Sequence, residues 1–242
     1  MSDTRRVHFI TYGNEKYRRA KIRLTNTAKR MGIFATVRAY GLGDLAPGFR
    51  ARFKEILRNE RGGGYWIWKP YIIKHQMERI RENDFLVYLD AGCTIDSHKG
   101  RRFHEYLETL SRSEYGILAF QLSFRECDWT VKECFSHFDV PLDSGIRRTG
   151  QLISGILIMK KTKHLEQIIN TWYQTVCDNV LLFTDHFNEC PQRPGFHENR
   201  HDQSVLSVIM KKYGAVVLAD ESYPNAAGRR QGLGPFIASR NC

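Results

Sequence analysis

The sequence lacks the patterns that mark several common classes of protein. No G-x-G-x-x-G follows its first predicted strand, so the usual dinucleotide-binding turn is missing and NAD binding is not expected. Its six cysteines form no C-x-x-C pair and show no zinc-ligand spacing. No stretch approaches the ~20 apolar residues of a membrane span, and no secretory signal opens the chain. We therefore expect a cytoplasmic protein with reduced thiols.

Basic and hydrophobic residues are both plentiful. The 242 residues include 37 Lys and Arg against 26 Asp and Glu, which gives a formal net charge of +11. This excess favours anionic partners such as nucleotide diphosphates, nucleic acid or an anionic membrane surface. Hydrophobic residues make up 42% of the chain, which is enough to bury a core and argues against disorder. The length suits a single domain over residues 1–242.

The order of the expected elements predicts an α/β fold. Residues 7–13 form a strand and its turn, residues 15–31 a helix, and residues 34–40 a second strand. This βαβ unit is typical of a parallel sheet. The expected fold therefore has a Rossmann-like, mostly parallel central sheet with helices on both faces. Further strands are expected at residues 85–89, 116–121, 151–160 and 216–219, and further helices at residues 49–59, 70–81, 100–110, 131–138, 162–179 and 205–213.

One short strand and the residues after it organise the chain. The apolar run over residues 85–89 stops at Asp90, and the next two residues, Ala91 and Gly92, are small. A carboxylate at the C-terminal end of such a strand lies where open parallel sheets bind ligands. Asp90 is interpreted as facing a ligand; the alternative is that it only caps the following helix.

A second unusual stretch, residues 62–70, holds three glycines, three aromatic residues, a lysine and a proline. Pro70 fits the first turn of a helix, which places Lys69 at the helix start. The helix dipole disfavours an ammonium there, and a bound diphosphate would explain it better. The alternative is that Trp66 and Trp68 belong to the core and Lys69 is solvated.

The second half of the chain holds two further candidate positions. Ser154 and Gly155 interrupt the strand at residues 151–160, and a glycine inside a central strand often marks a close backbone approach. Asp202 lies in the first turn of a helix, where a carboxylate is stabilised, so an ordinary capping cluster is the alternative there. The glycine- and arginine-containing tail, residues 221–242, is expected to be mobile or ordered by a ligand.

Four stretches carry a resemblance when they are taken in order: GYWIWKP at residues 64–70, LDAGC at 89–93, SGIL at 154–157 and HDQS at 201–204. Together they resemble a family of small GT-A-fold glycosyltransferases found in bacterial polysaccharide loci and in large algal and amoebal viruses. The resemblance spans residues 7–219. The first and last stretches are the most specific, whereas a strand-end aspartate alone is not.

The resemblance implies a hexosyl- or pentosyl-transferase in polysaccharide biosynthesis. It would move a sugar from a nucleotide-diphosphate donor, with a UDP-sugar favoured, to a glycan or another hydroxyl acceptor. Residues 1–95 would form the nucleotide-binding half and residues 96–220 the acceptor half. Asp202 would be the catalytic residue, as a general base under inversion or as a contact to the donor sugar under retention. The implied donor-binding residues are Thr11, Tyr12, Gly13, Trp68, Lys69, Asp90, Ala91, Gly92, Ser154, Gly155 and Gln203.

The resemblance also implies Mn²⁺ or Mg²⁺, because GT-A enzymes hold the metal and the diphosphate with a D-x-D motif. Asp90 takes the place of the first carboxylate and is the predicted metal ligand, whereas Gly92 replaces the second. Either one carboxylate suffices together with phosphates, water and another side chain, or the activity is metal-independent. Mg²⁺ keeps several waters, so a single carboxylate does not exclude it. His197, His201 or Asp96 could contribute a further ligand, and the sequence favours none of them.

Three other functions compete with glycosyl transfer. A catalytically inactive GT-A domain that binds sugar nucleotides or serves as a scaffold would fit the incomplete motif. A nucleic-acid-binding module would fit the charge, but the basic residues are spread along the chain and no nucleic-acid motif is present, so no nucleic acid is expected as a partner. A cysteine hydrolase built on Cys93 lacks an ordered base. The charge also predicts peripheral contact with anionic membranes.

Overall fold

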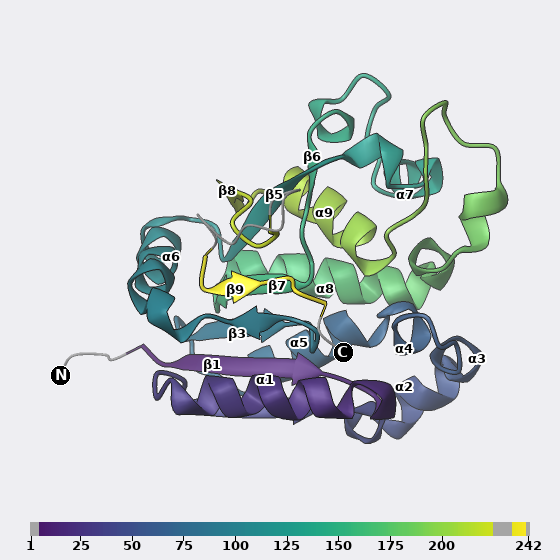
Figure 1. The fold of residues 1–242 in the computed structure, drawn as a ribbon. Coiled ribbons are helices and arrows are strands. Elements are labelled where there is room, and N and C mark those ends of the chain that lie inside the picture. The colour runs from purple at the N-terminus through teal and green to yellow at the C-terminus, as the bar shows by residue number, and fades with distance from the viewer. Residues whose placement is uncertain (1–4, 225–233, 241–242) are drawn as a thin grey trace.

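The computed structural model describes residues 5–224 and 234–240, and it places seven strands in one central sheet (Figure 1). The strand order is β2–β1–β3–β7–β5–β6, and β8 pairs with β5. The sheet strands are β1 (Val7–Tyr12), β2 (Thr36–Tyr40), β3 (Phe85–Leu89), β5 (Ile117–Arg125), β6 (Gly150–Leu152), β7 (Ile156–Lys160) and β8 (Val216–Ala219).

The directions of the strands make this a mixed sheet. β1 runs parallel to β2 and β3, and β8 runs parallel to β5. β7 runs antiparallel to both β3 and β5, and β6 runs antiparallel to β5. The α/β class is confirmed, and five of the seven sheet strands run in one direction, with only β6 and β7 running against them. The apolar pattern over residues 151–160 marks a strand without giving its direction, because direction depends on how the chain crosses over.

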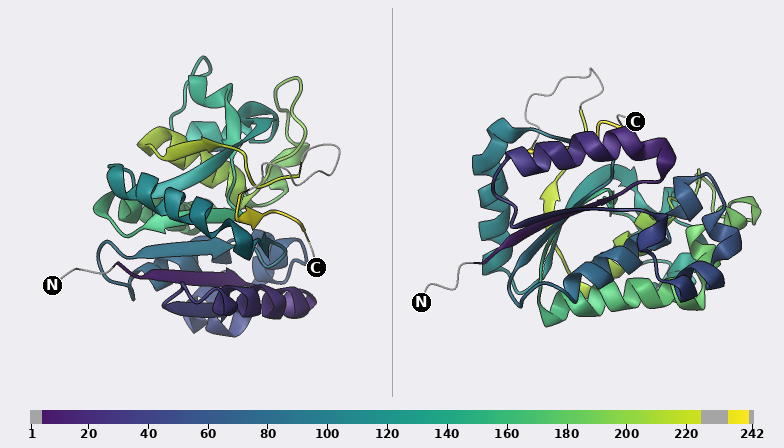
Figure 2. Two further views of the ribbon diagram at one scale, coloured as in Figure 1. Left: turned by 60° about the vertical axis from the view of Figure 1, so that its left-hand side comes forward. Right: turned by 90° about the horizontal axis from the view of Figure 1, so that it is seen from below.

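Helices cover both faces of the sheet, as expected (Figure 2). α1 (Arg18–Arg30) and α6 (Gly100–Arg112) share one apolar cluster with the sheet residues Phe9 and Val87. The opposite cluster joins the sheet to α5, α8 and α9. Those three helices are α5 (Trp68–Met77), α8 (Lys163–Asp178) and α9 (Asp202–Tyr213). The described chain also holds the short α-helices α2 (Pro47–Arg52), α3 (Lys54–Leu57), α4 (Gly62–Tyr65) and α7 (Lys132–His137).

The topology gathers three loops at one edge of the sheet. β1 and β3 are parallel, so both end at this edge, after Tyr12 and Leu89. β7 is antiparallel to β3, and its first residue, Ile156, pairs with Leu89. Ser154 and Gly155 therefore lie beside the residues that follow β3. Positions far apart in sequence meet at the edge where a ligand is expected.

The C-terminal segment returns to the same edge. β4 (Thr94–Ile95) pairs with β9 (Phe236–Ile237), and the two residues of β9 are buried. Residues 236–237 of the tail are thus paired with the strand that follows the Asp90 loop, and the expectation that the tail is mobile or ordered by a ligand stays a prediction. Residues 225–233 and 241–242 of the tail lie outside the described residues.

Neither a membrane-spanning helix nor a disulfide is found within the described part of the chain. None of the helices there is long and apolar enough to cross a bilayer. Five cysteines within the described ranges are free thiols. Cys93 is one of them and is 3% exposed, and burial raises the pKa of its thiol. A buried thiol with a raised pKa is a poor nucleophile, which argues against a cysteine hydrolase built on Cys93.

Asp84 ties the start of β3 to the start of β1, and its replacement gives a first prediction. Its Oδ1 accepts a hydrogen bond of 2.9 Å from the backbone N–H of Arg6. Burial acts to raise its pKa, but hydrogen bonds from Arg6, Arg81 and His8 outweigh burial and lower it. We expect Asp84→Asn to lower the free energy of unfolding at pH 7 by about 1–3 kcal/mol.

The pH dependence provides the check on this prediction. A carboxyl whose pKa is lower in the folded state adds stability above its unfolded value, near 3.8, and loses that stability as the pH falls through its folded value. Urea unfolding of wild type and Asp84→Asn should therefore converge on acidification, whereas the exposed control Asp143→Asn should follow wild type throughout. A constant difference at every pH would contradict this role of Asp84.

Candidate functional site

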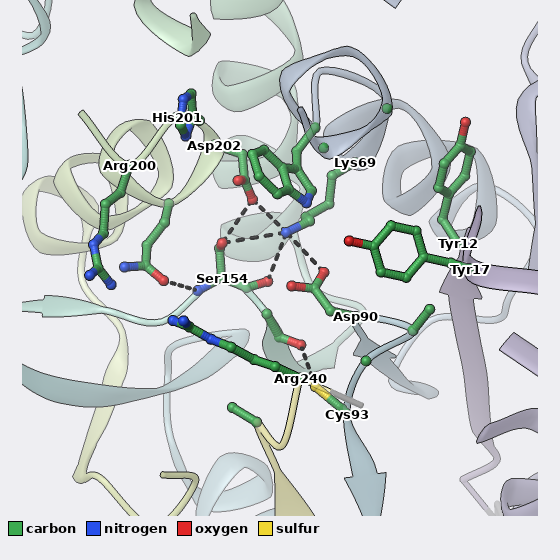
Figure 3. A pocket seen from close by; sticks show the side chains of 18 of the residues that line it. Tyr12, Tyr17, Lys69, Asp90, Cys93, Ser154, Arg200, His201, Asp202 and Arg240 are labelled. Atoms are coloured by element: carbon green, nitrogen blue, oxygen red, sulfur yellow. Dashed lines mark hydrogen bonds and ion pairs between the residues drawn. The ribbon is translucent and has the colours of Figure 1, made fainter. Parts of the chain in front are cut away.

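A cavity of about 530 Å³ opens at the edge where the three loops meet (Figure 3). Its size lies in the range of small-molecule sites. All but one of the predicted donor-binding and catalytic residues line it: Tyr12, Gly13, Trp68, Lys69, Asp90, Ala91, Gly92, Ser154, Gly155, Asp202 and Gln203.

Thr11 is the exception. Its side chain is fully buried within β1 and does not line the cavity. Successive side chains of a strand point to opposite faces, so Tyr12 and Thr11 cannot both face one ligand from this strand. The predicted donor contact of Thr11 is not supported by its position.

Lys69 lies at the centre of a buried ion cluster (Figure 3). Its side chain is 1% exposed, and its Nζ lies 2.5 Å from Asp202 Oδ2 and 3.2 Å from Asp90 Oδ1. Burial alone would lower the pKa of Lys69, but the two carboxylates outweigh burial and raise it, so the ammonium stays charged. The lysine at the start of α5 is thus explained by two aspartates of the protein itself, and the solvated-lysine alternative is wrong.

Asp90 reaches this cluster from the end of β3. The hydroxyl of Tyr88 donates to its Oδ1 at 2.5 Å, and its own backbone N–H donates to Gly155 O at 2.9 Å. A Cβ on Gly155 would lie only 2.8 Å from Asp90 Oδ2. The close approach predicted for Gly155 is therefore real, and it makes room for the Asp90 carboxylate. The side chain of Asp90 is 38% exposed, so a ligand in the cavity can reach it.

Asp202 reaches the cluster from the first turn of α9. The hydroxyl of Ser154 donates to its Oδ2 at 2.7 Å, the same oxygen that receives Lys69. Burial raises the pKa of Asp202, and Lys69 opposes that rise. Gln203 is held nearby, because its Nε2 donates to Gln151 Oε1 at 2.8 Å. The Asp202 carboxylate contacts Lys69 of α5 and Ser154 of the loop before β7. Asp202 therefore does not serve only to cap its own helix.

The two tryptophans of the glycine-rich stretch both line the cavity but differ in burial. Trp68 is 3% exposed, stacks on Tyr12 with ring centroids 3.7 Å apart, and donates from Nε1 to Gly62 O at 3.0 Å. Trp66 is half-buried and lines the cavity beside the ring of His201. The alternative that both tryptophans are core is therefore right for Trp68 only.

The additional metal ligands named by the sequence have other partners. His201 places its Nε2 3.0 Å from Asp185 Oδ1. The ring of His197 packs on Trp129, and Asp96 accepts a hydrogen bond from the backbone N–H of His98. None of these three contacts is with Asp90.

The donor set at Asp90 does not fit a divalent cation held by the protein. Within residues 5–224 and 234–240, no three His, Cys, Asp or Glu side chains gather as a metal-binding group. A cation on Asp90 would also lie beside the ammonium of Lys69, and two positive charges a few ångströms apart repel strongly in a buried site.

Arg200 and Arg240 line the cavity and were not predicted. The guanidinium Cζ of Arg200 lies 4.3 Å from the ring centroid of Phe124 and 4.2 Å from that of Trp129. Arg240 follows β9 and comes from the tail. The position of Arg200, two residues before Asp202, could have indicated that it lies near the site. Arg240 had no such signal, because β9 pairs with a strand more than a hundred residues away.

Comparison with known proteins finds similarity in fold alone. No family model and no curated protein matches the sequence. A glycosyltransferase involved in the glycosylation of the major capsid of PBCV-1 matches with a TM-score of 0.56 and 10% identity, over 96% of this chain and 91% of that one. The bifunctional glycosyltransferase WbbM matches with a TM-score of 0.51 and 9% identity, over 93% of this chain and 40% of that one. This chain has the GT-A fold.

The GT-A fold confirms the architecture that the four stretches implied. In this GT-A fold the loops after β1 and β3, the loop before β7 and the first turn of α9 form the walls of one cavity.

Proposed function

We propose that this protein is a glycosyltransferase that moves a sugar from a nucleotide-diphosphate donor to a hydroxyl group. The observation that carries the proposal is the cluster of Lys69, Asp90 and Asp202 in the wall of an open cavity of a GT-A fold. Charged groups as buried as Lys69 and Asp202 cost free energy, and a cluster of them in a cleft is a candidate functional site. The two similar solved structures described above are both glycosyltransferases.

The nucleoside is proposed to bind at the end of β1. Tyr12, Gly13 and Asn14 line the cavity there, and Tyr17 adds an aromatic ring. A UDP-sugar is the proposed donor, and a glycan is the proposed acceptor, in polysaccharide biosynthesis. Residues 1–95 would hold the nucleotide and residues 96–220 the acceptor, which agrees with the cavity having walls from both halves. Anionic membrane contact stays a prediction from the charge of +11.

The proposed chemistry follows from where charge develops. As the bond between the sugar and the diphosphate breaks, negative charge grows on the leaving phosphate and positive charge on the sugar. Lys69, fixed between Asp90 and Asp202, presents a positive charge beside the cavity without needing to reorganise. The charge of Asp90 and Asp202 would stabilise the cationic sugar.

Asp202 is the proposed catalytic carboxylate. The hydrogen bonds from Lys69 and Ser154 both end on its Oδ2 and fix the orientation of the group. Its raised pKa makes it a stronger base than an exposed aspartate. Under inversion it would take the proton of the acceptor hydroxyl, and under retention it would contact the donor sugar together with Gln203.

Nucleotide binding tests the proposed donor class. In a thermal-shift panel of nucleoside diphosphates and their sugars, a donor at 100 times its Kd should stabilise the protein by about 2.7 kcal/mol. For a chain of this length that corresponds to a rise in Tm of about 5–10 °C. The shift should be reduced in Tyr12→Ala, which removes a ring proposed to hold the nucleoside, and kept in the surface variant Asp143→Ala. If no nucleotide or nucleotide-sugar shifts the wild-type Tm, the proposed function is wrong.

A further inference from the structure

Each carboxylate that lines the cavity is paired with a cation of the same cavity. Lys69 pairs with both Asp90 and Asp202. Arg61 pairs with Glu198, with Nη2 2.9 Å from Oε2. A divalent cation prefers carboxylates that are not occupied by ammonium or guanidinium groups. The charge distribution of this cavity is therefore unsuited to a metal.

Arg200 provides the opposite kind of site. Its guanidinium is held against the faces of Phe124 and Trp129 and forms no salt bridge with any described residue. Burial and the charge of Arg240 lower the pKa of Arg200 more than Tyr223 and Glu198 raise it, so its charge is partly removed from water and is not compensated in full. An anion bound in the cavity would accept hydrogen bonds from the Arg200 guanidinium and balance its charge.

Arg240 brings a second guanidinium to the same part of the cavity. Figure 3 shows the end groups of Arg200 and Arg240 on the same side of the Lys69 cluster. The two residues come from unrelated segments, the loop before α9 and the residues after β9. The pairing of β9 with β4 keeps the second segment beside the loop that follows Asp90. Two planar guanidinium groups match the geometry of phosphate oxygens.

We propose that this cavity binds the diphosphate of the donor through Arg200 and Arg240 and does so without a divalent cation. The proposal rests on the proposed function for the identity of the ligand. The planar fork of each guanidinium donates two hydrogen bonds to phosphate oxygens, and Lys69 adds a fixed positive charge behind Asp90. A second carboxylate at position 92 is then not needed to hold a metal, because Arg200 and Arg240 supply the positive charge that the metal would bring.

Isothermal titration with UDP and with inorganic pyrophosphate tests the proposal. For wild type, the Kd of each should agree within about twofold in EDTA and in Mn²⁺. Arg200→Met keeps an apolar stem on the two rings and removes the charge, so it should weaken UDP and pyrophosphate by about 10- to 100-fold and leave uridine within about twofold. Arg240→Met should weaken the same two ligands. Arg101→Met, on the exposed face of α6, is the matched control.

The outcomes separate this proposal from the proposed function. UDP that binds only in Mn²⁺ overturns metal-free recognition and leaves the donor class intact. Pyrophosphate that binds in EDTA while no nucleotide of the panel binds supports the anion site and overturns the donor class. An Arg200→Met variant that keeps its Tm and binds UDP as wild type does overturns the role of Arg200. A wild type that binds neither ligand overturns both proposals.

Discussion

Replacing Lys69 by methionine is expected to lower the free energy of unfolding by about 3–5 kcal/mol. Methionine fills a similar volume but carries no charge. Asp90 and Asp202 would then face each other around a neutral side chain, and Asp202 is only 4% exposed. The cost comes mainly from the buried carboxylate of Asp202, which has lost its ammonium partner beside the part-exposed Asp90, and it exceeds what a lost surface ion pair would cause.

A second substitution shows whether charge is the cause. In the double variant Lys69→Met/Asp202→Asn one of the two carboxylates is neutral, so most of the lost stability should return in urea unfolding at pH 7. Burial already raises the pKa of Asp202, and a group with a raised folded pKa contributes stability that is lost as the pH rises through that value. The deficit of Lys69→Met should therefore shrink on acidification. A loss below about 1 kcal/mol at pH 7 would mean that water screens the cluster.

The second large effect is expected for Asp202→Asn. Asparagine keeps the size of the side chain and an oxygen for Lys69 and Ser154, but it cannot accept a proton. Sugar transfer should fall by about 10²- to 10⁴-fold, the usual contribution of a general base. Binding of the nucleoside diphosphate should stay within about threefold, because the groups proposed to hold it are Tyr12, Arg200 and Arg240.

Initial rates of nucleoside-diphosphate release measure this effect. The comparison needs wild type, Asp202→Asn and the surface variant Asp143→Asn at matched concentration. A rate in Asp202→Asn within tenfold of wild type would show that Asp202 only positions Lys69. A loss of both rate and nucleotide affinity would instead point to a collapsed site, which Tm values of the free proteins would reveal.

The positions that end or interrupt strands were predictable from the sequence. Asp90 follows an apolar run of the length of a strand, and the structure places it at the end of β3. Gly155 was expected at a close backbone approach, and the approach is to Asp90 itself. Such positions are local: a strand that stops and a glycine where a side chain would clash are both visible in a few neighbouring residues.

The interactions between distant segments were not predictable. The pair of Lys69 and Asp202 joins residues 133 positions apart, and local pattern gives no sign that an ammonium near a helix start will be buried between two carboxylates. The direction of β7 depends on the crossover that precedes it. Arg240 reaches the cavity because β9 pairs with β4, and a two-residue strand has too few residues for a recognisable period.

The turnover of nucleotide-sugars tests the central claim most directly. Wild type and Asp202→Asn would be incubated with a panel of UDP-, GDP- and CDP-sugars and a mixture of simple glycoside acceptors, and ³¹P NMR would follow the release of nucleoside diphosphate. The proposed function predicts release from at least one donor by wild type and a rate at least 10²-fold lower with Asp202→Asn. Equal release by both proteins, or no release from any donor that binds, would contradict it.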